Sequence, residues 1–240
     1  MGNLLPESAS SFAPDVDSII SLVTWTVGVW ALAAYVLFFL FLLVFRRRAG
    51  QRSSYVSGAG KQMAWVLVPV ALVLVCDLTI DYFNAPVWNR VKETLPASGD
   101  VIRVTGRQWM WEFTYPGADG KFDTADDIKS VNELHVRTNV PTRFELTAID
   151  VLHSFSVPSF RLKQDAVPGR RIEGWFEATK AGTYDIQCTQ MCGIGHASMA
   201  AHVTVESADD YAKYLKTASA QRNAPTRAVA TTFDSLWTRN

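Results

Sequence analysis

Two thiols, an imidazole and a thioether lie close together in the segment CTQMCGIGHASM, residues 188–199. Each of these groups is a ligand for a soft or borderline metal ion. Gly193 and Gly195 separate the second cysteine from the histidine, and glycine permits the tight turn that folds a loop back around an ion. The segment therefore predicts a metal site, and its candidate ligands are Cys188, Cys192, His196 and Met199.

Several kinds of site compete for this segment. A pair of cysteines in an exported domain often forms a disulfide, and two cysteines with two histidines suit zinc. A mononuclear blue-copper site uses one cysteine, two histidines and a weak axial methionine. Zinc has no use for Met199, and the blue-copper site has one thiolate fewer than this segment. Two thiolates in one turn can instead bridge two copper ions, which predicts a second histidine elsewhere in the chain.

The candidates for that second histidine are His135, His153 and His202. His135 in ELHVR and His202 in AAHVTVE lie in alternating patterns, so we expect both to be strand residues. His153 lies in AIDVLHSFSVPSF, between two runs that resemble strands, where a loop can present it at one end of a sandwich. We therefore predict that His153 completes the site.

Two apolar runs predict a membrane anchor. Residues 18–45 carry no charge and exceed the roughly 20 residues that a helix needs to cross a bilayer. Residues 63–83 are also long enough, although they include Asp77 and Asp81; Cys76 in the same run is expected to be a small apolar helix residue. The residues before the first run include acids but no Lys or Arg, unlike a cleaved signal peptide. We expect both spans to be retained.

The charges around the spans predict their orientation. The loop at residues 46–62 carries arginines and a lysine without one acid, so it is predicted to be cytoplasmic. Residues 1–17 then form an external N-terminal tail, and the chain from about residue 85 onward is exported. Acidic and basic residues are equal in number, 23 of each, which gives no electrostatic reason to expect a nucleic-acid partner.

The exported part reads as an all-β domain. Short β-branched and aromatic runs separated by Gly, Pro and Asp over residues 85–206 predict a sandwich or small barrel. Residues 207–240 are expected to form a C-terminal helix and a tail. Helical periodicity returns in ESADDYAKYLKTASAQR, where Ser207 can cap the helix with Asp209 and Asp210 in its first turn. We expect that helix to be followed by a loosely ordered tail.

Three other features have a structural and a functional interpretation. In GRQWMWEF, Trp109 and Trp111 alternate with Met110 and are predicted to share one face of a strand. The acidic loop GADGKFDTADDI can attract a basic protein, but a solvated hairpin tip is the simpler expectation. Asp77 and Asp81 lie on one helical face, where contact with a partner subunit is favoured over a proton role.

At this point the residues resemble a known family. DVLHSFSVPSFRLKQDAVPGR from Asp150, followed by CTQMCGIGHASM, resembles subunit II of haem-copper cytochrome c oxidases, the subunit that carries the dinuclear copper centre CuA. GRQWMWEF is similar to that family's aromatic stretch. The resemblance implies a membrane-anchored all-β chain in which two N-terminal transmembrane helices precede a cupredoxin-like β-sandwich or barrel.

The resemblance also implies roles for single residues. It makes Trp109 the residue through which an electron enters from cytochrome c, and it places Asp150 in an acidic docking surface. Where the family usually has the Glu that binds magnesium at the subunit boundary, this chain has the neutral Gln190, so magnesium stays an open question. The copper ligands that the resemblance implies are His153, Cys188, the backbone carbonyl of Gln190, Cys192, His196 and Met199.

The function implied by the resemblance is electron transfer within an oxidoreductase complex. The subunit accepts electrons from cytochrome c or another haem protein and passes them to catalytic subunit I, which reduces oxygen to water and pumps protons; subunit III is a further expected partner. No C-x-x-C-H motif occurs, so the donor is another protein. Gln62 stands where many members carry a Glu near a proton channel, which gives no support to proton uptake through this subunit.

The expected location is a bacterial plasma membrane, in preference to the mitochondrial inner membrane, with both termini and the copper domain on the periplasmic side. Two other functions stay open. An equivalent subunit of a nitric oxide reductase would differ in the product formed by its complex. A membrane-tethered copper carrier would release its copper quickly to a weak chelator.

Overall fold

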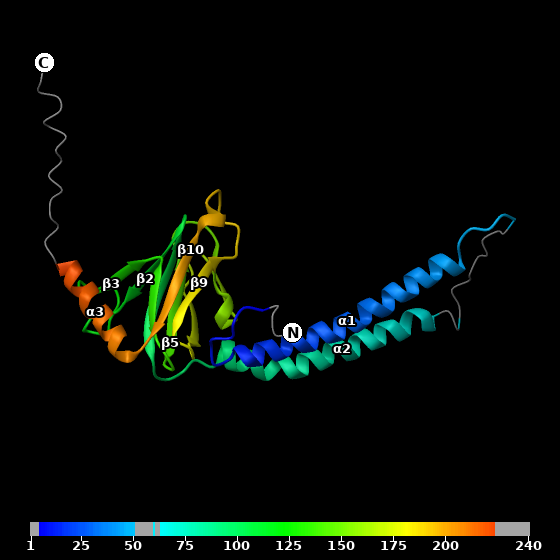
Figure 1. The fold of residues 1–240 in the computed structure, drawn as a ribbon, viewed down its shortest axis with the longest axis horizontal. Helices are drawn as coiled ribbons and strands as arrows, with labels where there is room; N and C mark the ends of the chain where they lie inside the picture. Colours follow the sequence, from blue (N-terminus) through cyan, green and yellow to red (C-terminus); the bar gives the residue numbers. More distant parts are fainter. Residues whose placement is uncertain (1–4, 51–59, 61–62, 224–240) are drawn as a thin grey trace, which may run out of the picture.

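The computed structural model describes residues 5–50, 60 and 63–223 of the chain, so Gln62 and most of the loop at residues 46–62 lie outside the described residues. Two long helices, α1 (Ala13–Val44) and α2 (Ala64–Trp88), lie side by side and lead to a β-domain at one end (Figure 1). Both helices are long and apolar enough to cross a membrane. The predicted pair of N-terminal spans is confirmed.

The helices extend beyond the predicted bounds of the spans. α1 begins at Ala13 rather than at residue 18, since a proline and an acidic residue favour its first turn. α2 continues past residue 83 to Trp88 and passes into a π-helical turn, η2 (Asn89–Glu93). Hydropathy marks only the apolar part of a helix, so the polar ends near the β-domain were not visible in the sequence pattern.

The residues just before α1 belong to the edge of the β-domain. Ser10 forms an antiparallel bridge with Ala178. Phe12 is fully buried and meets the ring of Trp175 edge-on at 5.6 Å between centroids. The expected tail over residues 1–17 is therefore, in this stretch, an ordered part of the domain, because its backbone and Phe12 find partners that only the fold brings near.

In the described part of the chain, ten strands form two sheets of five. The first sheet has the order β3 (Ile128–Val131), β2 (Met110–Tyr115), β1 (Asp100–Arg107), β5 (Pro141–Ala148), β8 (Ile172–Glu177). The second has the order β4 (Glu133–Arg137), β10 (Ala200–Glu206), β9 (Gly182–Cys188), β6 (His153–Val157), β7 (Leu162–Ala166). The predicted all-β sandwich is confirmed, although its first strand begins only at Asp100.

Parallel pairs join β1 to β5 and β4 to β10, and the other pairs are antiparallel. Two short 3-10 helices lie in loops of the second sheet: η3 (Pro158–Phe160) precedes β7, and η4 (His196–Ser198) precedes β10. The second of these lies inside the predicted metal-binding segment.

A C-terminal helix, α3 (Ala208–Asn223), packs against β3 and β4. The backbone N–H of Asp210 donates to the Ser207 hydroxyl at 3.2 Å, and that hydroxyl donates to the Asp210 carboxylate at 2.7 Å. The ring of Tyr214 stacks on His135 at 3.6 Å. The predicted helix and its cap are confirmed, and the expected tail from residue 224 lies outside the described residues.

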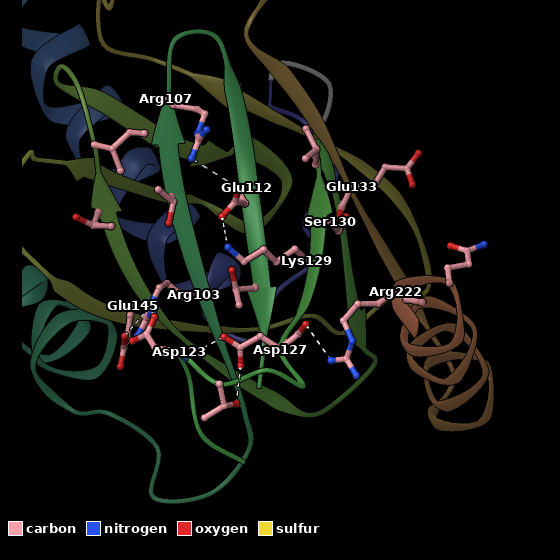
Figure 2. A pocket seen from close by; sticks show the side chains of 18 of the residues that line it. Arg103, Arg107, Glu112, Asp123, Asp127, Lys129, Ser130, Glu133, Glu145 and Arg222 are labelled. Atoms are coloured by element: carbon pink, nitrogen blue, oxygen red, sulfur yellow. Dashed lines mark hydrogen bonds and ion pairs between the residues drawn. The ribbon is translucent and has the colours of Figure 1, made fainter. Parts of the chain in front are cut away.

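The outer face of the first sheet is polar and forms a groove of about 1040 Å³ with α3 (Figure 2). Its charges pair across the groove: Arg107 and Lys129 lie 3.7 and 3.3 Å from the carboxylate of Glu112. Asp123 from the acidic loop lies 2.7 Å from Arg103. Since these loop and sheet charges are matched locally, the groove is the solvated face of the sandwich and the acidic loop is a hairpin tip.

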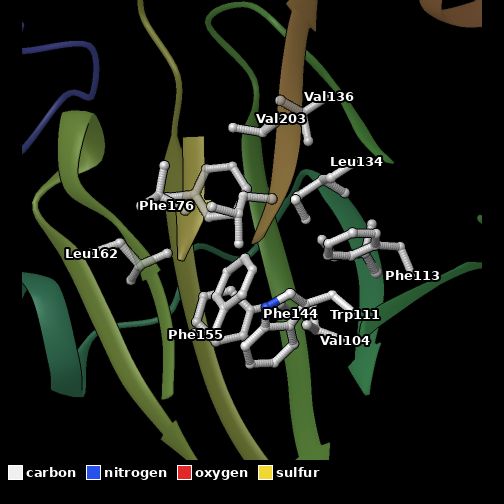
Figure 3. Packing of buried hydrophobic residues seen from close by; sticks show 14 of the residues in the cluster. Val104, Trp111, Phe113, Leu134, Val136, Phe144, Phe155, Leu162, Phe176 and Val203 are labelled. Atoms are coloured by element: carbon white, nitrogen blue, oxygen red, sulfur yellow. The ribbon is translucent and has the colours of Figure 1, made fainter. Parts of the chain in front are cut away.

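The inner faces of the two sheets form the hydrophobic core (Figure 3). Phe155 of β6 meets the rings of Trp111, Phe113 and Phe144 edge-on, with centroids 5.4, 6.3 and 6.0 Å apart. Each such pair contributes about 0.5–1.5 kcal/mol beyond its buried area. The aromatic packing joins β6 to the opposite sheet and gives the site at its end a rigid base.

We predict that Phe12→Ala lowers the free energy of unfolding of the β-domain by about 3 kcal/mol, because it leaves a cavity beside Trp175. Thermal unfolding of the full chain in detergent, followed by tryptophan fluorescence, measures the effect. Phe38→Ala is the matched control, since that ring is exposed on the membrane-spanning part of α1. Equal stability of the two variants would contradict the role of the N-terminal segment.

Candidate metal centre

The predicted ligands meet at one end of the second sheet, where β6 begins and β9 ends. β6 begins at His153, β9 ends at Cys188, and the two strands pair so that Phe155 lies opposite Cys188. This register brings His153 Nδ1 to 3.9 Å from Cys188 Sγ. The donor atoms of His153, Cys188 and Cys192 all lie within 4.8 Å of one another, and all three residues are buried.

The loop between β9 and β10 supplies the other donors. Cys192 Sγ lies 3.8 Å from Cys188 Sγ, 3.6 Å from His196 Nδ1 and 3.8 Å from Met199 Sδ. Cys188 Sγ lies 3.3 Å from the backbone carbonyl oxygen of Gln190. Burial and the neighbouring Cys188 thiol raise the pKa of Cys192 to about 11. Every residue that the sequence predicted for the site is thus brought into one cluster.

The donor set fits a soft metal ion. Metal-thiolate bonds of about 2.3 Å allow one ion to touch both sulfurs across their separation of 3.8 Å. A tetrahedral zinc site would use four donors and leave the buried Met199 without a function. Both thiols are free, and thiolates, imidazoles and a thioether together suit copper.

Asp150 holds the far side of the His153 ring. Its Oδ1 lies 2.8 Å from His153 Nε2, and its carboxylate also accepts the backbone N–H groups of Gln108 and Val151 at 2.6 Å each. Burial acts to raise the pKa of Asp150, but these hydrogen bonds outweigh it and lower the pKa from its usual value. The ionised Asp150 carboxylate therefore accepts a hydrogen bond from His153 Nε2. The other ring nitrogen of His153, Nδ1, faces the thiols.

Trp109 lies in the turn between β1 and β2, against the metal-binding loop. A Cβ on Gly195 would come within 2.4 Å of the indole, so only glycine permits this contact. The neighbouring Gln108 side chain donates to the Cys192 carbonyl at 2.7 Å. Trp109 is 40% exposed whereas Trp111 is fully buried. The prediction that they share a face is wrong, because strand alternation does not extend into a turn.

Gln108 is the residue that sequence reasoning missed. Its backbone N–H donates to Asp150, which holds His153, and its side chain donates to the backbone carbonyl of Cys192 in the metal-binding loop. Its position beside Trp109 was visible, but a polar residue in a predicted strand gave no reason to assign it a role.

The other two histidines stay outside the cluster, as predicted. His135 in β4 has its Nδ1 3.0 Å from Glu206, and His202 in β10 has its Nδ1 3.3 Å from Asp185 on the exposed face. Both are strand residues with acidic neighbours of their own.

Comparison with known proteins shows the family. Residues 100–207 match the periplasmic domain of cytochrome c oxidase subunit II. The chain is 30% identical over 229 residues to alternative cytochrome c oxidase subunit 2 of Bradyrhizobium diazoefficiens, with 84% of this chain and 79% of the relative covered. This chain belongs to the cytochrome c oxidase subunit II family.

The chain is also similar to two further proteins. Cytochrome c oxidase subunit 2 of Cereibacter sphaeroides is 28% identical, with 87% of this chain and 80% of the relative covered. The crystal structure of the periplasmic domain of subunit II from Bradyrhizobium japonicum is 32% identical and covers 53% of this chain and 99% of that domain, with a TM-score of 0.48.

Membership of the cytochrome c oxidase subunit II family makes the chain a subunit of an oxidoreductase complex. The family normally binds copper, which agrees with the donor set at the end of β6 and β9. The two apolar helices anchor the chain in the membrane, and the β-domain matches the family's periplasmic domain.

We predict that Asp150→Ala lowers copper affinity by about 10- to 100-fold, because the candidate ligand His153 loses the partner that orients its ring. Competition with a chelator of known copper affinity measures the loss. Asp185→Ala is the matched control, since Asp185 also faces a histidine, but an exposed one outside the cluster. A variant of Asp150 with unchanged affinity would restrict this residue to the predicted docking role.

Proposed function

We propose that this chain is the electron-accepting subunit of a cytochrome c oxidase. It receives electrons from cytochrome c or another haem protein at a dinuclear copper centre and delivers them to the catalytic subunit, which reduces oxygen to water and pumps protons. The observation that carries this proposal is the convergence of two thiols, two imidazole nitrogens, a thioether and a carbonyl at one end of a packed sandwich.

The residues of this chain would hold the two ions in a fixed frame. When bound, the dinuclear centre supplies a site that gains and loses one electron with little change in its bonds. His153 and Cys188 lie on strand ends and Met199 directly precedes β10, so the core limits their movement. The proposed ligands are His153, Cys188, the carbonyl of Gln190, Cys192, His196 and Met199.

Trp109 is the proposed point at which electrons enter. Its indole is partly exposed on one side and packs on the metal-binding loop on the other. Met191 and Ile194 on the same loop are 74% and 99% exposed, and they offer apolar contacts to a donor. Asp150 keeps 28% of its side chain exposed, so its proposed docking role is compatible with its bond to His153.

The proposed setting is a bacterial plasma membrane with the copper domain and both termini on the periplasmic side. The arginine-rich loop at residues 46–62 supports this orientation. Catalytic subunit I and subunit III are the proposed membrane partners. A neutral Gln190 side chain weakens the case for magnesium at the subunit boundary.

We predict that Cys188→Ser abolishes the electron paramagnetic resonance signal of an unpaired electron shared by two copper nuclei. Oxygen is a poorer ligand than sulfur for Cu(I), so the second ion is lost or its coupling changes. Cys76→Ser is the matched control, because Cys76 lies in α2 and accepts a hydrogen bond from Trp30 far from the cluster. A Cys188→Ser variant that kept the two-copper signal would refute the bridging assignment.

We predict that Trp109→Ala slows electron transfer within the bound donor complex by about tenfold or more, equivalent to roughly 1.4 kcal/mol of barrier. Stopped-flow oxidation of reduced cytochrome c at saturating donor, with copper content measured in parallel, reports the rate. Ile194→Ala should instead weaken donor binding and leave the saturating rate unchanged, since its side chain is fully exposed and touches no ligand. An unchanged rate for Trp109→Ala would remove this residue from the electron route.

A further inference from the structure

The outer face of the second sheet carries three metal-ligating side chains in one row. β4, β10 and β9 are consecutive strands of this sheet, and β9 and β10 are seen side by side in Figure 1. Their register pairs His202 with Glu133 on one side and with Asp185 on the other. Residues paired across neighbouring strands point to the same face, about 4.8 Å apart. All three side chains are exposed, whereas Val203, the next residue of β10, is buried in the core.

His202 and Asp185 already lie at the separation that one bound ion requires. His202 Nδ1 is 3.3 Å from Asp185 Oδ1. Zinc binds a histidine nitrogen and a carboxylate oxygen at about 2.1 Å, and tetrahedral bond angles then separate the two donor atoms by about 3.4 Å. The side chains are 58% and 72% exposed, so an ion from solution reaches the pair directly.

Glu133 supplies the third donor. Its carboxylate has no hydrogen-bond or ion-pair partner among the described residues, and its exposed side chain can turn toward the imidazole from the side opposite Asp185. The residues of β10 that share a face with His202 are Ala200 and Thr204. Because both are small, they leave room for an ion above the sheet.

The charge of the row favours a divalent cation. No Arg or Lys of the described chain forms an ion pair with either carboxylate, so one imidazole lies between two acids. A cross-strand contact of about 0.2–1 kcal/mol accounts for a histidine beside one acid, but it leaves the second acid unmatched. His135 on the same face shows that simpler case, since its Nδ1 lies 3.0 Å from Glu206 and its ring stacks on Tyr214.

We propose that His202, Asp185 and Glu133 form a second metal site, which binds one divalent transition-metal ion such as Zn²⁺ and leaves a fourth position to water. We call it the three-strand site. Its nitrogen and oxygen donors are harder than the two thiolates of the candidate metal centre, so the two sites prefer different ions. The inference does not depend on the proposed function.

Zinc binding to the copper-loaded full chain in detergent tests the three-strand site. Equilibrium dialysis with radioactive zinc should show one saturable ion per chain. His202→Ala should weaken this binding by at least about tenfold, since even a residue behind a ligand contributes about 10- to 100-fold to metal affinity. Asp185→Asn and Glu133→Gln each remove one charged donor and should weaken it as well. Thr183→Ala is the matched control, because Thr183 is exposed on the same face of β9 and should not affect the affinity.

A variant without the thiols separates the three-strand site from the candidate metal centre. Cys188→Ser with Cys192→Ser should lose the two-copper signal and keep the zinc affinity of the three-strand site. In this variant, Cu²⁺ bound in place of zinc should show electron paramagnetic resonance coupling to one nitrogen, since the row contains one imidazole. Zinc binding that disappears with the thiols, or that His202→Ala leaves unchanged, would overturn the inference.

The outcomes also separate this inference from the proposed function. If the wild-type chain gave no two-copper signal, the proposed function would fail while zinc binding at the three-strand site persisted. A two-copper signal without a zinc site sensitive to His202→Ala would overturn only this inference. In competition with a copper chelator, the three-strand site has no thiolate and loses its ion first, so Asp185→Ala stays a valid control for the candidate metal centre.

Discussion

The metal centre depends on one short antiparallel ladder between β6 and β9. The ladder contains two residue pairs, Phe155 with Cys188 and Ser156 with Gln187. This register places His153 and Cys188 at the same end of the sheet. Every residue of β6 is buried, and Phe155 packs against three aromatic rings of the opposite sheet. A shift of one residue would turn these side chains to the other face and separate the ligands.

The turn between β1 and β2 connects the metal-binding end of the second sheet to the first sheet. Gln108 donates its backbone N–H to Asp150, which holds His153, and donates its side chain to the carbonyl of Cys192. Gln108, the residue next to Trp109, therefore bonds both to the carboxylate that holds His153 and to the loop that carries Cys192. The proposed point of electron entry thus rests on the same hydrogen-bonded frame as the candidate metal ligands, which keeps both preorganised.

A second set of contacts orients the domain relative to the membrane helices. Phe12 is buried in the β-domain at the start of α1, and the Arg161 guanidinium lies 2.6 Å from the Asp17 carboxylate. Arg90, after α2, pairs with Asp15 of α1. Because these contacts lie where the helices meet the domain, they hold the candidate metal centre at a defined position relative to the membrane helices, which the proposed transfer to a membrane-embedded partner requires.

The sequence by itself determined the membrane spans, the all-β class of the domain that follows them and the residues of the candidate metal site. These features are visible because hydropathy, strand alternation and ligand spacing are local properties of the chain. The tertiary structure alone decided that residues before α1 join the β-domain and that Trp109 lies in a turn apart from Trp111. It also decided that Asp150 holds His153 and that Gln108 bonds to both Asp150 and the carbonyl of Cys192. Each of these depends on contacts between segments far apart in the sequence, and no local pattern encodes which of them will meet.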